Sequence, residues 1–409
     1  PSSYNTTMHN IPVSWPPCLI IQPKRFGFDK DTLLKYKLSN SENEFTFPHE
    51  FDMADYCGNK YTRRNGYESA HQILSGIKPQ FFPAMAYFVT SIPDHEIPIN
   101  EDGARHYLGR HGFTEGMIKG FLRNAMQVPI RFFICDDSGS MYENDGWHLV
   151  KSSAGVLKSV PCSRWDELKD SLEFHMGLAD ASNSLTEFHS LNGLPSLVIG
   201  DFERDPDRCG LREMKKVLAK GPHGGTPLCA HINAIIPQIR SAERRLREAG
   251  QVACIVICTD GQCSDGNLVQ AMKPLEHLPC WVVVKLCTDD DAIVNYWNNV
   301  DNQLELEMDV LDDFEGEAQE THSHNPWLVY GLELHRIREW GFKLHKEFDM
   351  LDERKLSHTQ MVNVMNILFN KETQDFPHPQ ADAHEFKRAI KACLPTIQPT
   401  YDPVTKRVV

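Results

Sequence analysis

The sequence predicts an α/β protein built on a doubly wound, mainly parallel β-sheet. Three observations support this: apolar runs of strand length, helical segments between the runs, and polar residues directly after them. The clearest runs are Ile130–Cys135, Val252–Thr259 and Cys280–Leu286. Strands that are apolar on both faces and alternate with helices are typical of a parallel sheet covered by helices on both sides. We place this α/β domain at residues 128–315.

Residues 1–127 are expected to form an irregular N-terminal extension of mixed structure that ends in helices. Up to about Pro98 the sequence is rich in proline and aromatic residues and shows no sustained periodicity. Residues 102–126 then fit two helices that are broken near Gly112, with Thr114 as the N-cap of the second. The candidates before this point are strands at 18–22, 44–47 and 87–90 and a short helix near 68–75.

Within the α/β domain, helices and strands are expected to alternate after the first strand. The segment between Cys135 and Ser163 is predicted to be a loop. The last strand, at 304–311, alternates apolar and acidic residues and is predicted to lie at the edge of the sheet. The other expected elements are helices at 163–182, 207–220, 228–249, 267–274 and 293–300 and strands at 186–189 and 196–199.

Residues 316–409 are expected to be a helical C-terminal region that packs on the core. Residues 325–353 and 357–372 are both amphipathic. Ser357 and Gln360 fit a capping box at the start of the second segment. The tail from Pro379 is predicted to supply one more helix and an extended end.

The composition, net charge and apolar runs disfavour nucleic-acid-binding and membrane-spanning proteins. The chain has 409 residues, with 41% hydrophobic and 24% charged residues, as in ordinary globular proteins. A net charge of −14 argues against nucleic-acid binding, which normally requires a basic surface. No apolar run is long enough to span a bilayer, and the N-terminal sequence lacks the pattern of a signal peptide. We therefore expect no nucleic-acid partner and no membrane span.

The twelve cysteines indicate a reducing compartment. Several lie in apolar strand-like runs, where a thiol is a small core residue. Cys254 and Cys258 are four residues apart, so on one strand they would share a face without coming close enough to bond. There is no C-x-x-C pair and no regular disulfide-like spacing. We expect reduced cysteines and a cytoplasmic location.

Polar residues follow two of the predicted strands and precede one long helix. Asp136, Ser138 and Ser140 come directly after the first strand, Thr226 precedes the helix at 228–249, and Asp260 follows the strand at 252–259. Ligands of doubly wound proteins bind beyond the carboxyl ends of the strands, so we expect these side chains to converge there. Two carboxylates and three hydroxyls suit a hard divalent cation such as Mg²⁺.

These motifs resemble the von Willebrand factor A family and its metal-ion-dependent adhesion site. The resemblance rests on D-x-S-G-S-M after a buried strand, G-G-T-P before a helix and T-D-G after another strand, and it covers residues 128–315. It implies that Asp136, Ser138 and Ser140 ligate the metal directly. It also implies that Thr226 joins them in the ligand-bound form, and Asp260 directly or through water. The implied metal is Mg²⁺, Mn²⁺ or Ca²⁺.

Four further residues are candidates for the rim of this site. Gly139 permits the tight turn between the two serines, and Gly225 lets the backbone approach. His223 lies in the loop before Thr226. Asp265 either lines the rim or caps the helix that follows it, and capping is our prediction. Asp137 falls at the free position of the motif and need not ligate anything.

The resulting functional hypothesis is a scaffold-type protein without enzymatic activity, in which the metal captures an Asp or Glu of a protein partner. One alternative is self-assembly, in which acidic residues after Leu311 of a second copy reach the site. A second is a metal-dependent hydrolase, or a serine hydrolase with Ser138 or Ser140 as nucleophile and His223 as base. The serine motif lacks the G-x-S-x-G elbow, which disfavours the hydrolase.

Overall fold

The computed structural model describes residues 26–28, 35–37, 92–93, 97–151, 157–193, 196–203, 205–288, 290–342, 346–369 and 376–409. The chain divides into two compact units, residues 1–82 and 83–409. In the first, strand β1 (Phe26–Phe28) pairs antiparallel with β2 (Lys35–Lys37). The strands expected at 18–22, 44–47 and 87–90 and the helix expected near 68–75 lie outside the described residues.

The second unit is organised around a six-stranded sheet with the order β10-β9-β8-β3-β6-β7. All neighbours are parallel except β6 and β7. The predicted mainly parallel sheet is therefore confirmed, with one antiparallel edge strand. Its strands are β3 (Ile130–Cys135), β6 (Thr186–Ser190), β7 (Leu197–Ile199), β8 (Ala253–Thr259), β9 (Cys280–Leu286) and β10 (Met308–Leu311).

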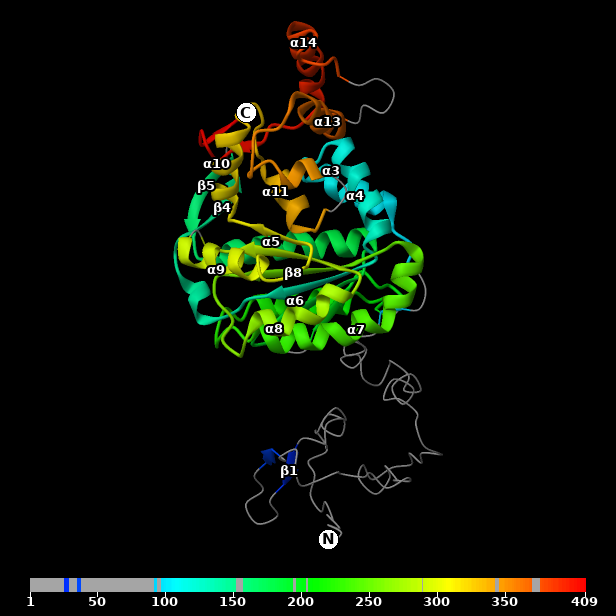
Figure 1. Ribbon diagram of the computed structural model, residues 1–409, viewed down its shortest axis with the longest axis vertical. Helices are drawn as coiled ribbons and strands as arrows, with labels where there is room; N and C mark the ends of the chain where they lie inside the picture. The colour runs from blue at the N-terminus through cyan, green and yellow to red at the C-terminus, as the bar shows by residue number, and fades with distance from the viewer. Residues whose placement is uncertain are drawn as a thin grey trace. The chain divides into compact units, whose positions relative to one another are not determined.

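Helices cover both faces of this sheet (Figure 1). Because side chains alternate along a strand, Phe133 points to one face of β3 and Phe132 to the other. Phe133 belongs to a hydrophobic cluster with α5 (Arg164–Ser182) and α4 (Glu115–Gln127), whereas Phe132 belongs to a second cluster with α7 (Leu228–Ala249). The helices of this part are α5 (Arg164–Ser182), α6 (Cys209–Leu218), α7 (Leu228–Ala249), α8 (Leu268–Met272) and α9 (Asp291–Asp301), with short 3₁₀ turns at Gly139–Tyr142 and Lys273–His277.

Two helices precede the sheet, as the sequence predicts. They are α3 (Glu101–Arg110) and α4 (Glu115–Gln127). The hydroxyl of Thr114 accepts a hydrogen bond from the backbone N–H of Met117 at 3.3 Å, which is the predicted N-cap. Gly112 has a φ of +86°, a left-handed conformation that favours glycine and ends the first helix.

An antiparallel hairpin lies where a loop was expected, between β3 and α5. Strands β4 (Gly146–Lys151) and β5 (Leu157–Cys162) pair with each other and are not part of the central sheet. The loop prediction is therefore wrong. Both strands mix apolar and polar residues without the continuous apolar run of a buried strand, so the pattern that identifies the central strands does not reveal them.

The C-terminal part is helical, but its first long helix is shorter than predicted. Within 325–353 the structure forms only α11 (Leu332–Glu339) and α12 (Lys346–Asp349). Gly331 precedes α11, and Gly341 follows it with a φ of +80° that interrupts the helix. The remaining elements are α10 (Phe314–His324), α13 (His358–Phe369), α14 (Ala383–Cys393), a 3₁₀ turn at Leu394–Thr396, and strands β11 (Tyr401–Asp402) and β12 (Arg407–Val408).

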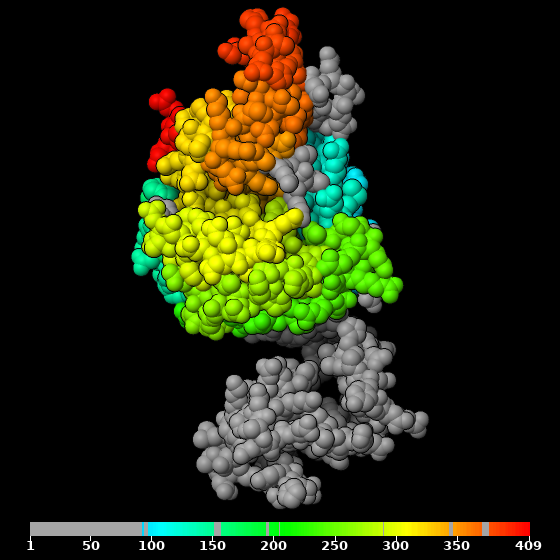
Figure 2. Space-filling view, in the orientation of Figure 1, coloured from blue at the N-terminus to red at the C-terminus, as the bar shows by residue number. Residues whose placement is uncertain are grey.

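The capping box at the start of α13 is confirmed. The backbone N–H of Ser357 donates to Gln360 Oε1 at 3.0 Å, and the N–H of Gln360 donates to Ser357 Oγ at 3.3 Å. Phe386 of α14 packs in a small apolar cluster with Val362 and Met365 of α13. Figure 2 shows α14, in orange-red, standing out from the α/β body beyond α13.

Candidate functional site

The ends of two neighbouring strands bring the predicted carboxylates to one edge of the sheet. Strands β3 and β8 are parallel, and Cys135 pairs with Cys258 at their carboxyl ends. The backbone N–H of Asp136 continues this pairing by donating to the carbonyl of Cys258 at 2.9 Å. Asp136 and Asp260 therefore leave the sheet side by side, although 124 positions separate them in the sequence.

Hydrogen bonds connect four of the five predicted site residues. Ser138 Oγ lies 3.0 Å from Ser140 Oγ, and Ser140 Oγ donates to Asp260 Oδ1 at 2.9 Å. The backbone N–H of Ser138 donates to Asp136 Oδ1 at 2.9 Å. The other oxygen of Asp136 accepts from the hydroxyl of Thr259 at 2.6 Å. These contacts place two carboxylates and two serine hydroxyls in one small cluster.

Thr226, the fifth residue, lies beside this cluster. Its backbone exchanges two hydrogen bonds with Ser264, at 3.0 and 2.9 Å, which join its loop to the loop after β8. A Cβ atom added to Gly261 would lie 3.9 Å from Thr226 Oγ1, so the threonine side chain faces the turn after Asp260. Within the described part of the chain, no hydrogen bond joins this hydroxyl to the other four residues.

The two carboxylates differ in their electrostatic surroundings. Asp136 is completely buried, and burial raises its pKa to about 6 although Thr259 and Ser138 donate hydrogen bonds to it. No basic side chain among the described residues forms an ion pair with Asp136. Asp260, in contrast, accepts a hydrogen bond from Arg164 Nη1 at 2.9 Å.

Arg164 is a further site residue, one that the sequence did not reveal. It is the first residue of α5, and its Nε also donates to Asp145 Oδ1 at 2.7 Å, so it bridges two carboxylates. The pKa of the Arg164 guanidinium is raised above its usual value, and its hydrogen bonds to Asp145 are the largest cause. A basic residue in the first turn of a helix opposes the helix dipole, so an arginine there signals an acidic partner outside the helix.

The glycines of the predicted rim make close backbone contacts. The N–H of Gly139 donates to the carbonyl of Gly224 at 3.2 Å, and Gly224 adopts a φ of +80°. The carbonyl of Gly225 accepts from Asn192 Nδ2 at 2.7 Å. The loop before α7 is therefore fixed against both the D-x-S-G-S turn and the segment after β6.

His223 and Asp137 support these loops. The two ring nitrogens of His223 lie 3.2 Å from the carbonyl of Asn192 and 3.4 Å from that of Gly221. Asp137 accepts from the N–H of Asn192 at 2.8 Å and also from the hydroxyl of Ser190. The second aspartate of the motif thus ties β3 to the segment after β6, a role that the sequence did not reveal.

Asp265 caps a helix, but not the one expected. Its carboxylate accepts from the N–H groups of Cys229 and Ala230, at 3.0 and 2.8 Å, in the first turn of α7. The helix that follows Asp265, α8, is capped by Asn267 instead. The predicted target is therefore wrong, because the loop after β8 folds back on the start of α7.

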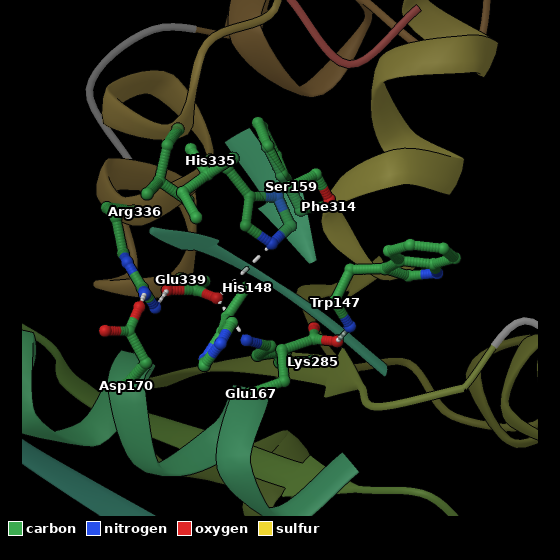
Figure 3. Close-up of a pocket in the computed structure, with 12 residues that line it drawn as sticks. Trp147, His148, Ser159, Glu167, Asp170, Lys285, Phe314, His335, Arg336 and Glu339 are labelled. Atoms are coloured by element: carbon green, nitrogen blue, oxygen red, sulfur yellow. Dashed lines mark hydrogen bonds and ion pairs between the residues drawn. The ribbon is translucent and has the colours of Figure 1, made fainter. Parts of the chain in front are cut away.

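A second cluster of charged groups surrounds Glu339 of α11 (Figure 3). Its two carboxylate oxygens lie 2.5 Å from Lys285 Nζ of β9 and 3.0 Å from Arg336 Nη1. His175 and His335 also lie within 2.9 and 3.3 Å of this carboxylate. The adjoining cavity, of about 20 Å³, holds at most about one water molecule.

The pKa values of this cluster follow from burial and charge. Burial alone would raise the pKa of Glu339, but Lys285 and Arg336 together hold it well below its usual range. Burial lowers the pKa of both His175 and His335 to about 4. The cluster is thus an internally balanced ion network with two neutral histidines.

Comparisons with known proteins identify no family for this chain but do find structural similarity. No family model matches the chain, and no curated protein matches it. A structural similarity is found to the crystal structure of conserved hypothetical protein BatB from Bacteroides thetaiotaomicron, with 17% identity and a TM-score of 0.26. It covers 38% of this chain and 65% of that chain, so the match spans just under two thirds of BatB. No helix of the described residues is long and apolar enough to cross a membrane.

Proposed function

We propose that the chain is a von Willebrand factor A-type protein that binds a divalent cation, Mg²⁺ in the first place, beyond the carboxyl ends of β3 and β8. The cation would be held by Asp136, Ser138, Ser140 and Asp260, with Thr226 joining when a partner binds. Its role is to present a positive charge to an Asp or Glu side chain of a protein partner.

The observation that carries this proposal is the uncompensated charge of Asp136. A buried carboxylate without a basic partner is costly, and its pKa of about 6 reflects that cost. A divalent cation would remove the cost, and carboxylate and hydroxyl oxygens are the ligands that Mg²⁺ prefers. The hydrogen-bonded cluster with Ser138, Ser140 and Asp260 supplies such oxygens at one place.

Arg164 adds no net positive charge to the site. Its guanidinium pairs with both Asp260 and Asp145, so the three carboxylates, the guanidinium and a divalent cation would sum to zero. The preference for a carboxylate of the partner therefore rests on the cation itself, which favours oxygen ligands.

A hydrolase has less support. A serine nucleophile needs a base within hydrogen-bonding distance. Among the described residues, no histidine forms a hydrogen bond with Ser138 or Ser140, and both ring nitrogens of His223 face backbone carbonyls. Ser140 donates to Asp260 instead.

Calorimetric titration with MgCl₂, and with MnCl₂ as a second probe, tests the cation site. We expect binding at one site per chain and a loss of at least about 100-fold in affinity for Asp136→Asn, because a neutral amide replaces a charged ligand. Glu143→Gln is the matched control, since Glu143 is an exposed carboxylate three residues after Ser140. Equal Mg²⁺ affinity of Asp136→Asn and the wild-type protein would refute the proposal.

Affinity capture from native lysate tests the partner. Proteins retained in MgCl₂ and released by EDTA are identified by mass spectrometry, and they should be lost with Asp136→Asn but kept with Glu143→Gln. Retention that is independent of EDTA would contradict the capture mechanism. Recovery of the chain itself would instead favour self-assembly, which sedimentation velocity with and without EDTA measures directly.

A further inference from the structure

Two cysteine thiols lie in contact beside the candidate metal site. Cys229 is the second residue of α7, and Cys263 lies in the loop after β8. Their sulfur atoms are 3.3 Å apart, although the residues are 34 positions apart in the sequence. With Asp265 they form a group of three potential ligand atoms that all lie within 4.8 Å of one another.

The pair joins the two loops that carry candidate metal ligands. Cys229 lies three residues after Thr226, and Cys263 lies three residues after Asp260. The same loops are already joined by two hydrogen bonds: the N–H of Thr226 donates to Ser264 Oγ, and the N–H of Ser264 donates to the carbonyl of Thr226. A covalent bond between the thiols would therefore restrict the movement of Thr226 relative to Asp260.

We propose that Cys229 and Cys263 form a reversible disulfide that fastens these two loops. A disulfide requires sulfur atoms about 2.05 Å apart, so an approach of roughly 1.2 Å from the present contact is enough. The two thiols together lose two protons and two electrons. The oxidant is a low-molecular-weight disulfide such as glutathione disulfide, which is reduced to two thiols.

The surroundings of the two thiols suggest an order of attack. Cys263 is the more exposed of the pair, so its thiolate displaces one thiol from the oxidant and forms a mixed disulfide. Cys229 is buried, and burial raises its pKa to about 12, so it stays protonated until the mixed disulfide lies beside it. Its sulfur then gives up its proton, attacks Cys263 Sγ and releases the second thiol.

A disulfide fits this cluster better than a metal ion does. The carboxylate of Asp265 is already engaged by the N–H groups of Cys229 and Ala230, which it caps. A metal would compete with these hydrogen bonds at the start of α7. A disulfide removes the weak hydrogen bond that the Cys263 thiol donates to Asp265 Oδ1 but leaves the two N–H bonds of the cap in place.

The functional consequence rests on the proposed cation binding. Under the proposed function Thr226 joins the other four ligands only when a partner binds, so partner binding changes its position relative to Asp260. A disulfide that holds its loop to the loop after β8 opposes that change. We expect the Mg²⁺-dependent retention of a partner in the affinity capture to be at least about threefold lower for the oxidised protein than for the reduced protein.

Mass spectrometry of the full chain tests the bond itself. After treatment with glutathione disulfide, free thiols are alkylated, and the protein is digested with trypsin and an endoproteinase that cleaves before aspartate. The expected product links peptide 221–240, which contains only Cys229, to peptide 260–264, which contains only Cys263. Dithiothreitol should separate them. Cys263→Ser should abolish the product, whereas Cys393→Ser, which removes a half-buried thiol on α14, should not.

Three results would overturn the proposal, and each differs from a failure of the proposed function. If both peptides remain fully alkylated after oxidation, the disulfide does not form. If zinc copurifies at one per chain and is lost with Cys263→Ser, the cluster is a metal site. If the disulfide forms but the Mg²⁺-dependent retention of a partner is unchanged, the coupling is wrong. Absence of Mg²⁺ binding in the reduced wild-type protein would refute the cation site and leave the disulfide standing.

Discussion

Asp136 and Glu339 are both buried carboxylates packed at the same sheet, but their charges are balanced differently. Lys285 and Arg336 surround Glu339 and hold its pKa well below the usual range. Asp136 receives hydrogen bonds only from neutral groups, including the hydroxyl of Thr259, and burial raises its pKa to about 6. The fold supplies Glu339 with cationic partners, whereas no cation among the described residues pairs with Asp136.

From this difference we expect the cluster around Glu339 to be structural and the cluster around Asp136 to bind a cation. Glu339 of α11 pairs with Lys285 of β9 and with His175 of α5, so these contacts hold α11 on the sheet and its covering helix. The neighbours of Asp136 come from loops at the carboxyl ends of β3 and β8, where ligands of such sheets bind. Removing one partner should therefore affect stability in the first cluster and cation binding in the second.

The largest expected effect on stability is that of Glu339→Gln. This change leaves Lys285 buried without its ion-pair partner and leaves Arg336 with Asp170 alone. Breaking a buried ion network from one side costs about 3–5 kcal/mol, and we expect a loss of this size in the free energy of unfolding. Denaturant titration followed by circular dichroism measures it.

The matched control for this prediction is Glu213→Gln. Glu213 pairs with Lys216 on the surface of α6, and such exposed pairs contribute about 0–1 kcal/mol. If Glu339→Gln lost no more stability than this control, Glu339 would not be holding α11 on the sheet.

The same cluster predicts a loss of stability in acid. The folded pKa of about 4 for His175 and His335 lies below the value of about 6.5 expected in the unfolded chain. The stability that the two neutral histidines contribute to the fold is therefore complete above pH 6.5 and is lost as the pH falls towards 4. Each tenfold difference in proton affinity between the folded and the unfolded chain corresponds to about 1.4 kcal/mol, so we expect a loss of a few kcal/mol.

Comparison with His335→Gln isolates this contribution. Glu167 acts in the opposite direction, because burial raises its pKa to about 7 and its stabilisation is lost as the pH rises. The free energy of unfolding is therefore measured for both proteins between pH 7 and 4, and the value for His335→Gln is subtracted from the wild-type value at each pH. A difference that does not change with pH would show that His335 is not kept neutral by the fold.

Asp136→Asn should change the free energy of unfolding by less than about 1 kcal/mol. Asparagine can accept from the N–H of Ser138 and donate to Thr259, so both hydrogen bonds of the carboxylate can be kept. The substitution also removes a buried charge without a partner. A loss near that of Glu339→Gln, measured by the same denaturant titration, would mean that Asp136 is structural and would remove the contrast between the two clusters.

The sequence predicts the parts of this molecule that depend on local pattern. The apolar runs of β3, β8 and β9 identify the parallel sheet, and the N-cap at Thr114 is visible from residue type alone. The convergence of the polar residues also follows, because carboxyl ends of parallel strands meet at one edge. The strand pattern alone therefore predicts that Asp136 and Asp260 lie close together.

The remaining features depend on contacts between distant segments. Asp265 caps α7 rather than α8 because its loop folds back on the start of α7, and no local sequence pattern predicts this contact. The hairpin β4–β5 escapes prediction because its strands are not continuously apolar. Arg164 follows this hairpin directly, so its position beside Asp260 cannot be inferred when the hairpin is predicted to be a loop.

Arg164→Gln has the smallest expected effect, which is on Mg²⁺ affinity. It tests how the charges at the proposed cation site are balanced. Arg164 Nη1 lies 2.9 Å from Asp260 Oδ2, where a positive charge repels an incoming cation and occupies one of its ligands. Removing that charge should tighten Mg²⁺ binding roughly threefold to tenfold, which corresponds to about 1 kcal/mol. Lys169→Gln, which removes a cation on α5 that pairs with Asp166, should leave the calorimetric affinity within about twofold. Weaker Mg²⁺ binding by Arg164→Gln would mean that the arginine orients Asp260 for the cation rather than competing with it.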